Sequence, residues 1–414
     1  TAGRQDWFSA LDGRSIFYPS VGASFVFSEL IDVPVMNFAK VRGSWAQLTN
    51  DPSQFAYQTS LYYNLSGSAN GFPLGQISNG AIPNANLKPN TLVETEFGLE
   101  FKFLDNRIGL DVAYYNKKTT DEPINITTSF TSGYTSASLN VGSLENKGIE
   151  LLLTGTPVKS QDFTWNISFN FTRNNNKVVK LNEGLNSIGI ATSRSLNAFA
   201  QHVVGEPASQ VRAFDYSRDA NGAIIHDANG FPVQGELKSY GSGHHPNFGG
   251  VNNEFNYKGV NFSFKSGGKI FSATDYYAYI FGLHKNTLVG RNEDIISAGV
   301  NASGAANTVP VKSWDYYGGG SGIANRISSL FVYDASFVKL RQIVLGYTLP
   351  ASIFKSGVIQ SVNVSFVARN VAILKKNTPN IDPESNLNNG VGQGLELAGV
   401  PPTRSYGFNL NVKF

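Results

Sequence analysis

The last nine residues of the chain constrain its fold more than any other stretch. They alternate strictly between apolar and small or polar side chains, with apolar residues at Tyr406, Phe408, Leu410, Val412 and Phe414. A period of two is the pattern of a β-strand with one dry face and one wet face. Chain ends are usually frayed and polar. A dry face that continues to the final residue therefore predicts a strand that pairs on both sides, as strands do in a closed barrel.

The same alternation recurs along the chain. It is found in the ranges 21–28, 39–46, 93–103, 108–115, 149–154, 163–172, 255–264, 340–347 and 362–369. We expect roughly a dozen strands of about ten residues, the length that a tilted strand needs to cross a bilayer. The polar face of the hairpin 93–115 carries Glu94, Glu96, Glu100, Lys102 and Asp111. In a barrel, such a face lines a water-filled lumen.

The connections alternate between short and long. Short turns are expected at Asp105-Asn106, 158–162 and Lys258-Gly259, and long loops at 48–90, 116–141, 174–246, 272–326 and 371–403. Outer-membrane barrels have short periplasmic turns and long extracellular loops. The sequence therefore predicts an all-β, transmembrane antiparallel β-barrel over residues 1–414, with its long loops extracellular. No helix is expected beyond a single turn at 351–358, and a bulge is expected near Leu340-Arg341.

Composition excludes several other classes. Charged residues make up 15% of the 414 residues and the net charge is +3, so the basic clusters of a nucleic-acid-binding protein are missing. The chain has no Cys, which rules out disulfides and thiolate metal sites. The sequence contains no run of 18 apolar residues, so no transmembrane helix is predicted. Because the chain starts at Thr1 without a Met, we expect a piece of a longer protein.

No arrangement of residues predicts catalysis, so we expect neither an enzyme nor a cofactor. The one candidate substrate contact is the aromatic cluster Trp314, Tyr316 and Tyr317, in a long loop beside a glycine-rich stretch. These rings could form a stacking platform for a sugar or a peptide. The alternative is loop-against-loop packing or an interface belt, which is the more common role of such a cluster.

Two further patterns are interpreted as structural. Asp-Ala-Asn-Gly occurs at 219–222 and again at 227–230, and Asn-Gly favours the positive φ angles of tight turns. A calcium site is the alternative, but the spacing does not match an EF-hand loop. The adjacent His244 and His245 would point to opposite faces of a strand, which argues against joint metal ligation. No metal site is predicted.

Several stretches resemble the SusC/RagA-type TonB-linked outer-membrane transporters. They include Asn86-Leu87-Lys88-Pro89-Asn90, Asn140-Val141-Gly142-Ser143-Leu144-Glu145-Asn146-Lys147-Gly148, Ser336-Phe337-Val338-Lys339-Leu340-Arg341, Asp382-Pro383-Glu384 and Pro402-Thr403-Arg404-Ser405-Tyr406-Gly407-Phe408. They occur in the family's order over most of the chain. One departure is the passage from Phe264 to Ser266, where a longer strand is expected and where the sequence could be discontinuous.

The resemblance implies the C-terminal part of a barrel of about 22 strands, without the plug domain and TonB box. It implies a SusD-like surface lipoprotein, TonB and outer-membrane lipid as partners, and import of oligosaccharides or peptides. It also implies that the strand ending at Phe414 is a barrel-insertion signal. A structural role in a larger outer-membrane assembly or export machine stays open, because fold does not fix function. A soluble adhesin or propeller is a third alternative.

Overall fold

The computed structural model describes residues 2–6, 15–50, 63–77, 81–82, 84, 87–127, 134, 136–160, 163–181, 184–193, 195–255, 258–266, 269–272, 293–318, 322–349, 353, 359–385, 390, 392–400 and 402–414. The chain divides into two compact units. Unit 1 comprises residues 1–153, 173–188 and 203–206, and unit 2 comprises residues 154–172, 189–202 and 207–414. Within the described ranges, no helix has the length and apolarity needed to span a membrane.

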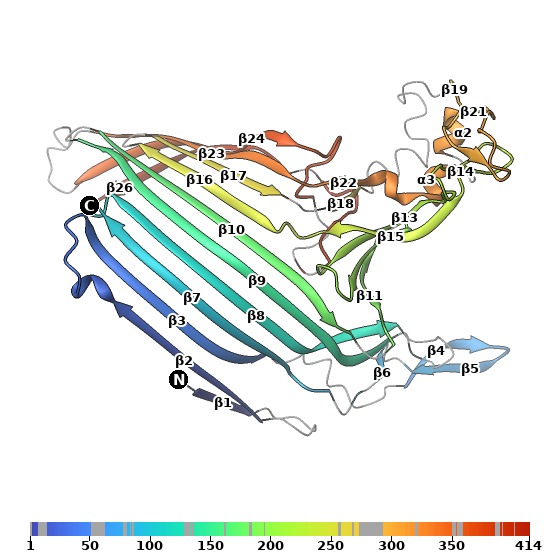
Figure 1. The fold of residues 1–414 in the computed structure, drawn as a ribbon, viewed down its shortest axis with the longest axis horizontal. Coiled ribbons are helices and arrows are strands. Elements are labelled where there is room, and N and C mark those ends of the chain that lie inside the picture. Colours follow the sequence, from blue (N-terminus) through green and yellow to red (C-terminus); the bar gives the residue numbers. More distant parts are fainter. Residues whose placement is uncertain are drawn as a thin grey trace. The chain divides into compact units, whose positions relative to one another are not determined.

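Unit 1 is an antiparallel sheet of long neighbouring strands (Figure 1). Its order is β1 (Ala2–Asp6), β2 (Ser15–Val26), β3 (Met36–Asn50), β7 (Asn90–Phe103), β8 (Ile108–Thr127), β9 (Ser136–Lys159) and β10 (Thr164–Lys180). Strands β9 and β10 each contribute residues to both units. The pairing is continuous along β7 and β8, from Thr91 opposite Thr120 to Phe103 opposite Ile108.

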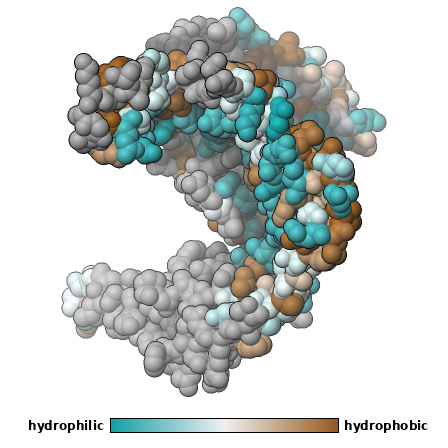
Figure 2. Space-filling model, turned by 90° about the vertical axis from the view of Figure 1, so that its left-hand side faces the viewer, coloured by the Kyte–Doolittle hydropathy of each residue, from teal (hydrophilic) through white to brown (hydrophobic). Residues whose placement is uncertain are grey.

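The register puts apolar side chains opposite one another on one face of the unit 1 sheet. Phe97 lies opposite Tyr114 and Leu99 lies opposite both Val41 and Val112. Phe97 and Tyr114 are 60% and 45% exposed, so the described residues leave this face uncovered at both positions. The space-filling view shows hydrophilic and hydrophobic residues gathered on separate sides of the strands (Figure 2). This is the segregation that the alternating sequence predicts.

Smaller elements complete unit 1. A 3-10 turn (Phe27–Glu29) leads out of β2. A separate hairpin consists of β4 (Tyr63–Ala69) and β5 (Phe72–Ile77), and the short β6 (Ala81–Ile82) pairs with β9 in parallel. The predicted turn between β7 and β8 is present at Asp105 and Asn106, both with positive φ.

Unit 2 contains a second run of antiparallel strands. After β10 the order is β16 (Asn247–Phe255), β17 (Lys258–Ser266), β23 (Phe337–Thr348), β24 (Ser361–Lys376) and β26 (Ser405–Lys413). The predicted bulge is confirmed, because the register of β23 shifts between Leu340 and Gln342. Strand β17 runs without a break through Phe264 and Ser266.

The long insertions of unit 2 have their own folded structure. One sheet has the order β11 (Ser187–Thr192), β12 (Ala198–Val203), β13 (Gln210–Tyr216) and β15 (Gln234–Ser242). Smaller sheets join β14 (Ile225–His226) to β20 (Val300–Asn301), β19 (Asp294–Ile295) to β21 (Val311–Lys312), and β18 (Lys269–Ser272) to both β22 (Val332–Asp334) and β25 (Leu395–Glu396). Helices α2 (Ser313–Tyr317) and α3 (Ile323–Arg326) and the 3-10 turn Ser328–Phe331 lie among them.

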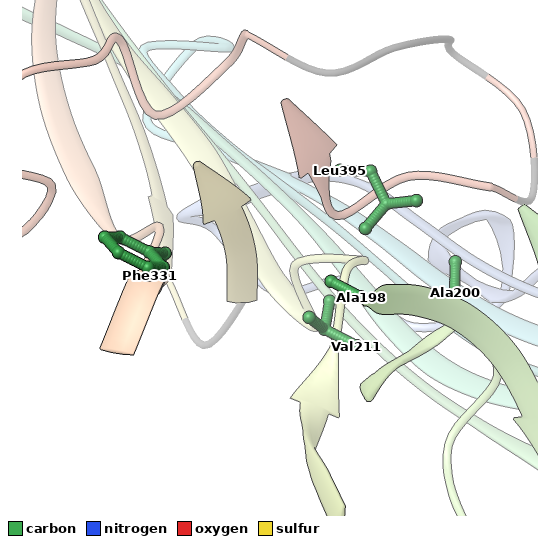
Figure 3. Packing of buried hydrophobic residues seen from close by; sticks show 5 residues of the cluster. All are labelled: Ala198, Ala200, Val211, Phe331 and Leu395. Carbon is green, nitrogen blue, oxygen red and sulfur yellow. The ribbon is translucent and has the colours of Figure 1, made fainter. Parts of the chain in front are cut away.

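A compact apolar core holds these insertions together. It consists of Ala198, Ala200, Val211, Phe331 and Leu395, which come from β12, β13, the 3-10 turn Ser328–Phe331 and β25 (Figure 3). Ala198, Ala200, Val211 and Leu395 have no exposed surface. The insertions are therefore folded parts of unit 2 with their own buried core.

Several predicted boundaries were wrong. Strand β8 continues to Thr127 and strand β9 begins at Ser136, so most of the predicted loop 116–141 is strand. The turn predicted at Lys258-Gly259 was wrong, because both residues belong to β17 and Lys258 already pairs with Phe255. Helices α2 and α3 were not expected, since helices of five and four residues are too short to show a 3.6-residue period. The helical turn predicted at 351–358 falls outside the described residues, apart from Ile353.

Candidate functional site

The polar face of the unit 1 sheet carries a ladder of ion pairs centred on Arg42. Its Nε atom lies 3.3 Å from Glu96 Oε1 and its Nη1 atom lies 3.0 Å from Asp111 Oδ1. Arg42 is on β3 and Asp111 is on β8, so the guanidinium crosses the intervening strand β7. It can do so because the residue opposite it is Gly98. A Cβ atom at Gly98 would come within 2.5 Å of Arg42 Nε.

The other charges of this face are also paired. Lys40 Nζ contacts Glu100 at 2.6 Å, Lys102 Nζ contacts Glu100 at 3.7 Å and Lys117 Nζ contacts Glu94 at 3.4 Å. Lys40, Arg42, Lys102 and Lys117 thus balance Glu94, Glu96, Glu100 and Asp111. These eight residues, which we name the wall ladder, sum to zero net charge. The wall ladder is therefore polar without a net charge of its own.

A second side chain crosses a strand in the same way. Tyr115 on β8 passes over Gly148 of β9 and donates its hydroxyl hydrogen to Asn174 Oδ1 on β10, at 3.0 Å. A Cβ atom at Gly148 would collide with the Tyr115 ring and come within 2.6 Å of the Arg173 carbonyl oxygen. The two glycines therefore allow polar side chains to bridge three neighbouring strands.

A shallow pocket of about 250 Å³ lies next to the wall ladder. It is lined by Gly22, Ala23, Ser24, Arg42, Gly43, Ser44 and Glu96. The small residues of β2 and β3 leave room for a solute, and Arg42 and Glu96 supply hydrogen-bond donors and acceptors. The pocket can accept polar groups, but its lining residues do not select one chemical class.

The predicted aromatic cluster is partly buried, and its Tyr316 and Tyr317 rings meet edge-on at 5.1 Å between centroids. Tyr316 is 5% exposed and packs with Val311, Ile323 and Ile327 in a second apolar core. Its hydroxyl donates to Ser297 Oγ at 2.8 Å, and burial raises its pKa. Trp314 and Tyr317 are half-buried. The loop-packing role therefore describes Tyr316, and contact with a substrate stays a prediction for Trp314 and Tyr317.

The two Asp-Ala-Asn-Gly repeats are turns. Asp219 Oδ1 accepts the N–H groups of Asn221 and Ala223 at 2.9 and 2.8 Å, and Gly222 has a φ of 83°. Asp227 repeats this pattern. A similar turn at 301–304, with the sequence Asn-Ala-Ser-Gly, was missed in the sequence analysis and uses the Asn301 side chain in the same way. One carboxylate oxygen of each Asp already binds backbone amides, which disfavours the calcium alternative.

The histidines do not converge on one site. His244 Nε2 lies 3.5 Å from the Gly390 carbonyl oxygen and His245 Nε2 lies 3.0 Å from that of Ala335. Burial, together with the neighbouring His244, lowers the pKa of His202 to about 4, so its neutral ring accepts the Ser209 N–H at 3.1 Å. Across the described ranges, no group of three or more His, Cys, Asp or Glu side chains could hold a metal ion.

A cluster of ion pairs around the buried Lys339 lies at the start of β23. Lys339 Nζ is 2.7 Å from both carboxylate oxygens of Asp382 and 2.8 Å from Glu384 Oε2. Arg341 Nη2 binds the other Glu384 oxygen at 2.7 Å. Lys339 is 1% exposed and Asp382 is 8% exposed. We name these four residues the root cluster. Its members come from two stretches quoted above for the family resemblance, which the fold brings into contact.

Glu384 of the root cluster is held in its ionised form. Burial alone would raise the pKa of Glu384, but hydrogen bonds from Arg341 and Lys339 outweigh it and bring the pKa to about 2. The phenyl ring of Phe337 lies under both cations, 5.0 Å from Lys339 Nζ and 5.7 Å from the Arg341 guanidinium. The alternating sequence gave no signal for this cluster, because its partners are 43 to 45 residues apart.

The C-terminal strand follows the predicted alternation. Phe408 lies opposite Phe366 of β24, and Leu410 lies opposite Val364, so the apolar faces of the two strands coincide. Phe408 and Leu410 are 83% and 64% exposed. The role of Tyr406, Phe408, Leu410, Val412 and Phe414 as an insertion signal stays a prediction.

These features define a class: an antiparallel outer-membrane barrel wall with one apolar face and one polar face. The family model "TonB dependent receptor-like, beta-barrel" matches residues 1–242, and the chain belongs to this family. TonB-dependent receptor P3 of Formosa agariphila is 28% identical over 97% of this chain and 42% of its own length. TonB-dependent receptor SusC of Bacteroides thetaiotaomicron is 27% identical over 97% of this chain and 40% of its own length.

The fold also matches a solved structure of the RagAB peptide transporter, with a TM-score of 0.76 and 21% identity. That match covers 98% of this chain and 44% of the RagAB chain. The chain thus spans about two fifths of the length of the curated relatives it matches.

Proposed function

We propose that this chain forms part of the barrel of a TonB-dependent importer of oligosaccharides or peptides in the outer membrane. The observation that carries the proposal is the pair of opposite faces on the unit 1 sheet. One face is apolar and uncovered, as lipid requires. The other is the wall ladder, which gives the lumen a polar surface without net charge.

The relatives support the solute class. One is the receptor SusC, and a structure with the same fold is described as a peptide transporter. We propose a SusD-like surface lipoprotein over the long loops, by analogy with the two-component RagAB complex. TonB would act through parts of the protein outside this sequence. The long loops would face the outside of the cell, with Trp314 and Tyr317 as candidate contacts for the solute.

Growth of the host tests the proposal. The gene is deleted, and growth is measured with each of a panel of glycans and peptides as the sole carbon or nitrogen source. Import predicts lost growth on one class of polymer, the same loss after removal of TonB, and recovery with the intact gene. Unchanged growth on every polymer would refute the proposal.

The alternative is a structural subunit of a larger outer-membrane assembly or export machine. Purification of the tagged full-length protein from membranes separates the two. One stoichiometric surface lipoprotein supports import. Several stoichiometric partners without such a lipoprotein support the structural role.

A further inference from the structure

The root cluster lies where three long insertions of unit 2 meet the strands. Its cations, Lys339 and Arg341, are on β23, directly after the insertion between β17 and β23. Its anions, Asp382 and Glu384, belong to the connection between β24 and β26. The third insertion lies between β10 and β16, and its last residues before β16 include His245. Side chains from all three segments therefore lie together.

Phe337 is the contact that joins the third segment to the root cluster. It is 2% exposed and lies under the two cations. Its other contact is the His245 ring, which meets it edge-on at 6.0 Å between centroids. His245 Nε2 also lies 3.0 Å from the Ala335 carbonyl oxygen. His245 is therefore held against the residues that precede β23.

The connection after the root cluster is fixed at two more points. A Cβ atom at Gly243 would come within 2.7 Å of Gly394 Cα, so the two backbones are in direct contact. Next to them, Leu395 is fully buried in the core formed with Ala198, Ala200, Val211 and Phe331. Both contacts join the same insertions that meet at the root cluster.

Charge and burial make the root cluster an all-or-none contact. Its two cations and two anions sum to zero, and each carboxylate is bound by at least one cation. Removing one member of a buried pair leaves an uncompensated charge out of water, which is strongly unfavourable. Replacing both members by apolar residues removes that penalty. The contacts around the root cluster should therefore open locally when one partner is lost and stay closed when both are replaced.

We propose that the root cluster is a positioning site: Lys339, Arg341, Asp382 and Glu384 hold the three insertions of unit 2 together as one body at the start of β23. The cluster acts through the position of the loops and does not itself contact solute. This proposal holds whether the protein imports a solute or serves as a structural subunit.

Hydrogen exchange of the full-length protein in lipid nanodiscs tests the proposal. In Lys339→Met, amide exchange is expected to rise by roughly 100-fold in all three segments, 241–246, 333–337 and 377–385, since the lost buried pair opens them together. The segment 241–246 is the decisive one, because it contributes no charge to the cluster. Peptides from β8 in unit 1 are expected to be unchanged and report that the barrel is intact.

Two matched variants complete the test. Lys339→Arg keeps the positive charge and brings a guanidinium fork that binds carboxylates, so it should keep more protection in all three segments than Lys339→Met. The double variant Lys339→Met with Asp382→Leu keeps the ion pair between Arg341 and Glu384, whose charges sum to zero. This variant should restore protection from exchange. Faster exchange confined to 377–385 in Lys339→Met would overturn the proposal. So would a double variant that is no better protected than Lys339→Met alone.

Discussion

The crossing of β7 by Arg42 can be tested by adding a single methyl group. In Gly98→Ala, the new Cβ atom would come within 2.5 Å of Arg42 Nε and 2.8 Å of its Nη2 atom. These atoms are the flexible end of a long side chain, so the guanidinium can swing away. It would then lose its contacts with Glu96 and Asp111, but the backbone would stay in place.

The expected loss follows from the exposure of these groups. The side chains of Arg42, Glu96 and Asp111 are 28%, 36% and 38% exposed. Ion pairs at this exposure contribute about 0.2–1 kcal/mol each. We expect Gly98→Ala to lower the free energy of unfolding by about 1 kcal/mol for the two pairs together.

Two other glycines calibrate the scale. At Gly148 the obstacle includes the Arg173 carbonyl oxygen at 2.6 Å, which belongs to the backbone of the next strand and cannot swing away. Overpacking costs about 1–3 kcal/mol, and the Tyr115–Asn174 hydrogen bond adds about 0.5–1.5 kcal/mol. We therefore expect Gly148→Ala to cost about 2–4 kcal/mol. At Gly22 the nearest atom would lie at 3.6 Å, an ordinary contact, so Gly22→Ala should be close to neutral.

Urea unfolding of the protein in lipid vesicles measures the three variants, with the folded fraction read from heat-modifiable gel mobility. The loss of unfolding free energy on substitution by Ala is expected to increase from Gly22 to Gly98 to Gly148. In an Arg42→Ala background, Gly98→Ala should have no further effect, because the side chain it displaces is gone. If Gly98→Ala remained equally destabilising in that background, the crossing of Arg42 would not be the cause.

Three further outcomes follow from the structure. The pKa of Glu384 is about 2, against an ordinary value of 4.5. The stabilising effect of its ionised form is therefore full above pH 4.5 and is lost as the pH falls from 4.5 to about 2. Cleavage at 377–385 by pepsin should rise over that pH window in the wild type, and an equal rise in Glu384→Gln would contradict an origin in Glu384. Tyr316→Phe loses one buried hydrogen bond, about 1 kcal/mol of stability, and should leave uptake of the growth-supporting polymer unchanged. Trp314→Ala should raise the half-saturation concentration for uptake of that polymer. Equal uptake by the two variants would remove Trp314 as a solute contact. Deleting Phe414 should lower the amount of barrel in the membrane, measured by quantitative blotting, and unchanged abundance would refute the insertion signal.

The strands could be predicted because alternation is a local property. Each residue of β7 or β8 shows its face through neighbours two positions away, so a window of ten residues is enough. The same logic placed Glu94, Glu96 and Glu100 on one polar face. It could not pair them with Lys117, Arg42 and Lys40, because those pairs depend on the register between strands. Gly98 and Gly148 are the local sign that a side chain from a neighbouring strand passes over these positions. The sequence alone does not identify those side chains.

The insertions could not be predicted because their order comes from contacts between distant segments. Strand β18 pairs with β22 and β25, which lie about 60 and 120 residues further along the chain. Tyr316 was a candidate for solute contact, but Ile323 and Ile327 surround it in a core that no short window reveals.

Lys339 shows the limit of the pattern most clearly. Phe337, Lys339 and Arg341 occupy alternate positions of a strand, and two cations at such positions are ordinarily assigned to a wet face. Yet Lys339 is 1% exposed, because Asp382 and Glu384 cover it from 43 and 45 residues away. A lysine this deeply buried requires a carboxylate partner. The Asp-Pro-Glu stretch of a glycine- and asparagine-rich loop can supply that partner only once the chain has folded.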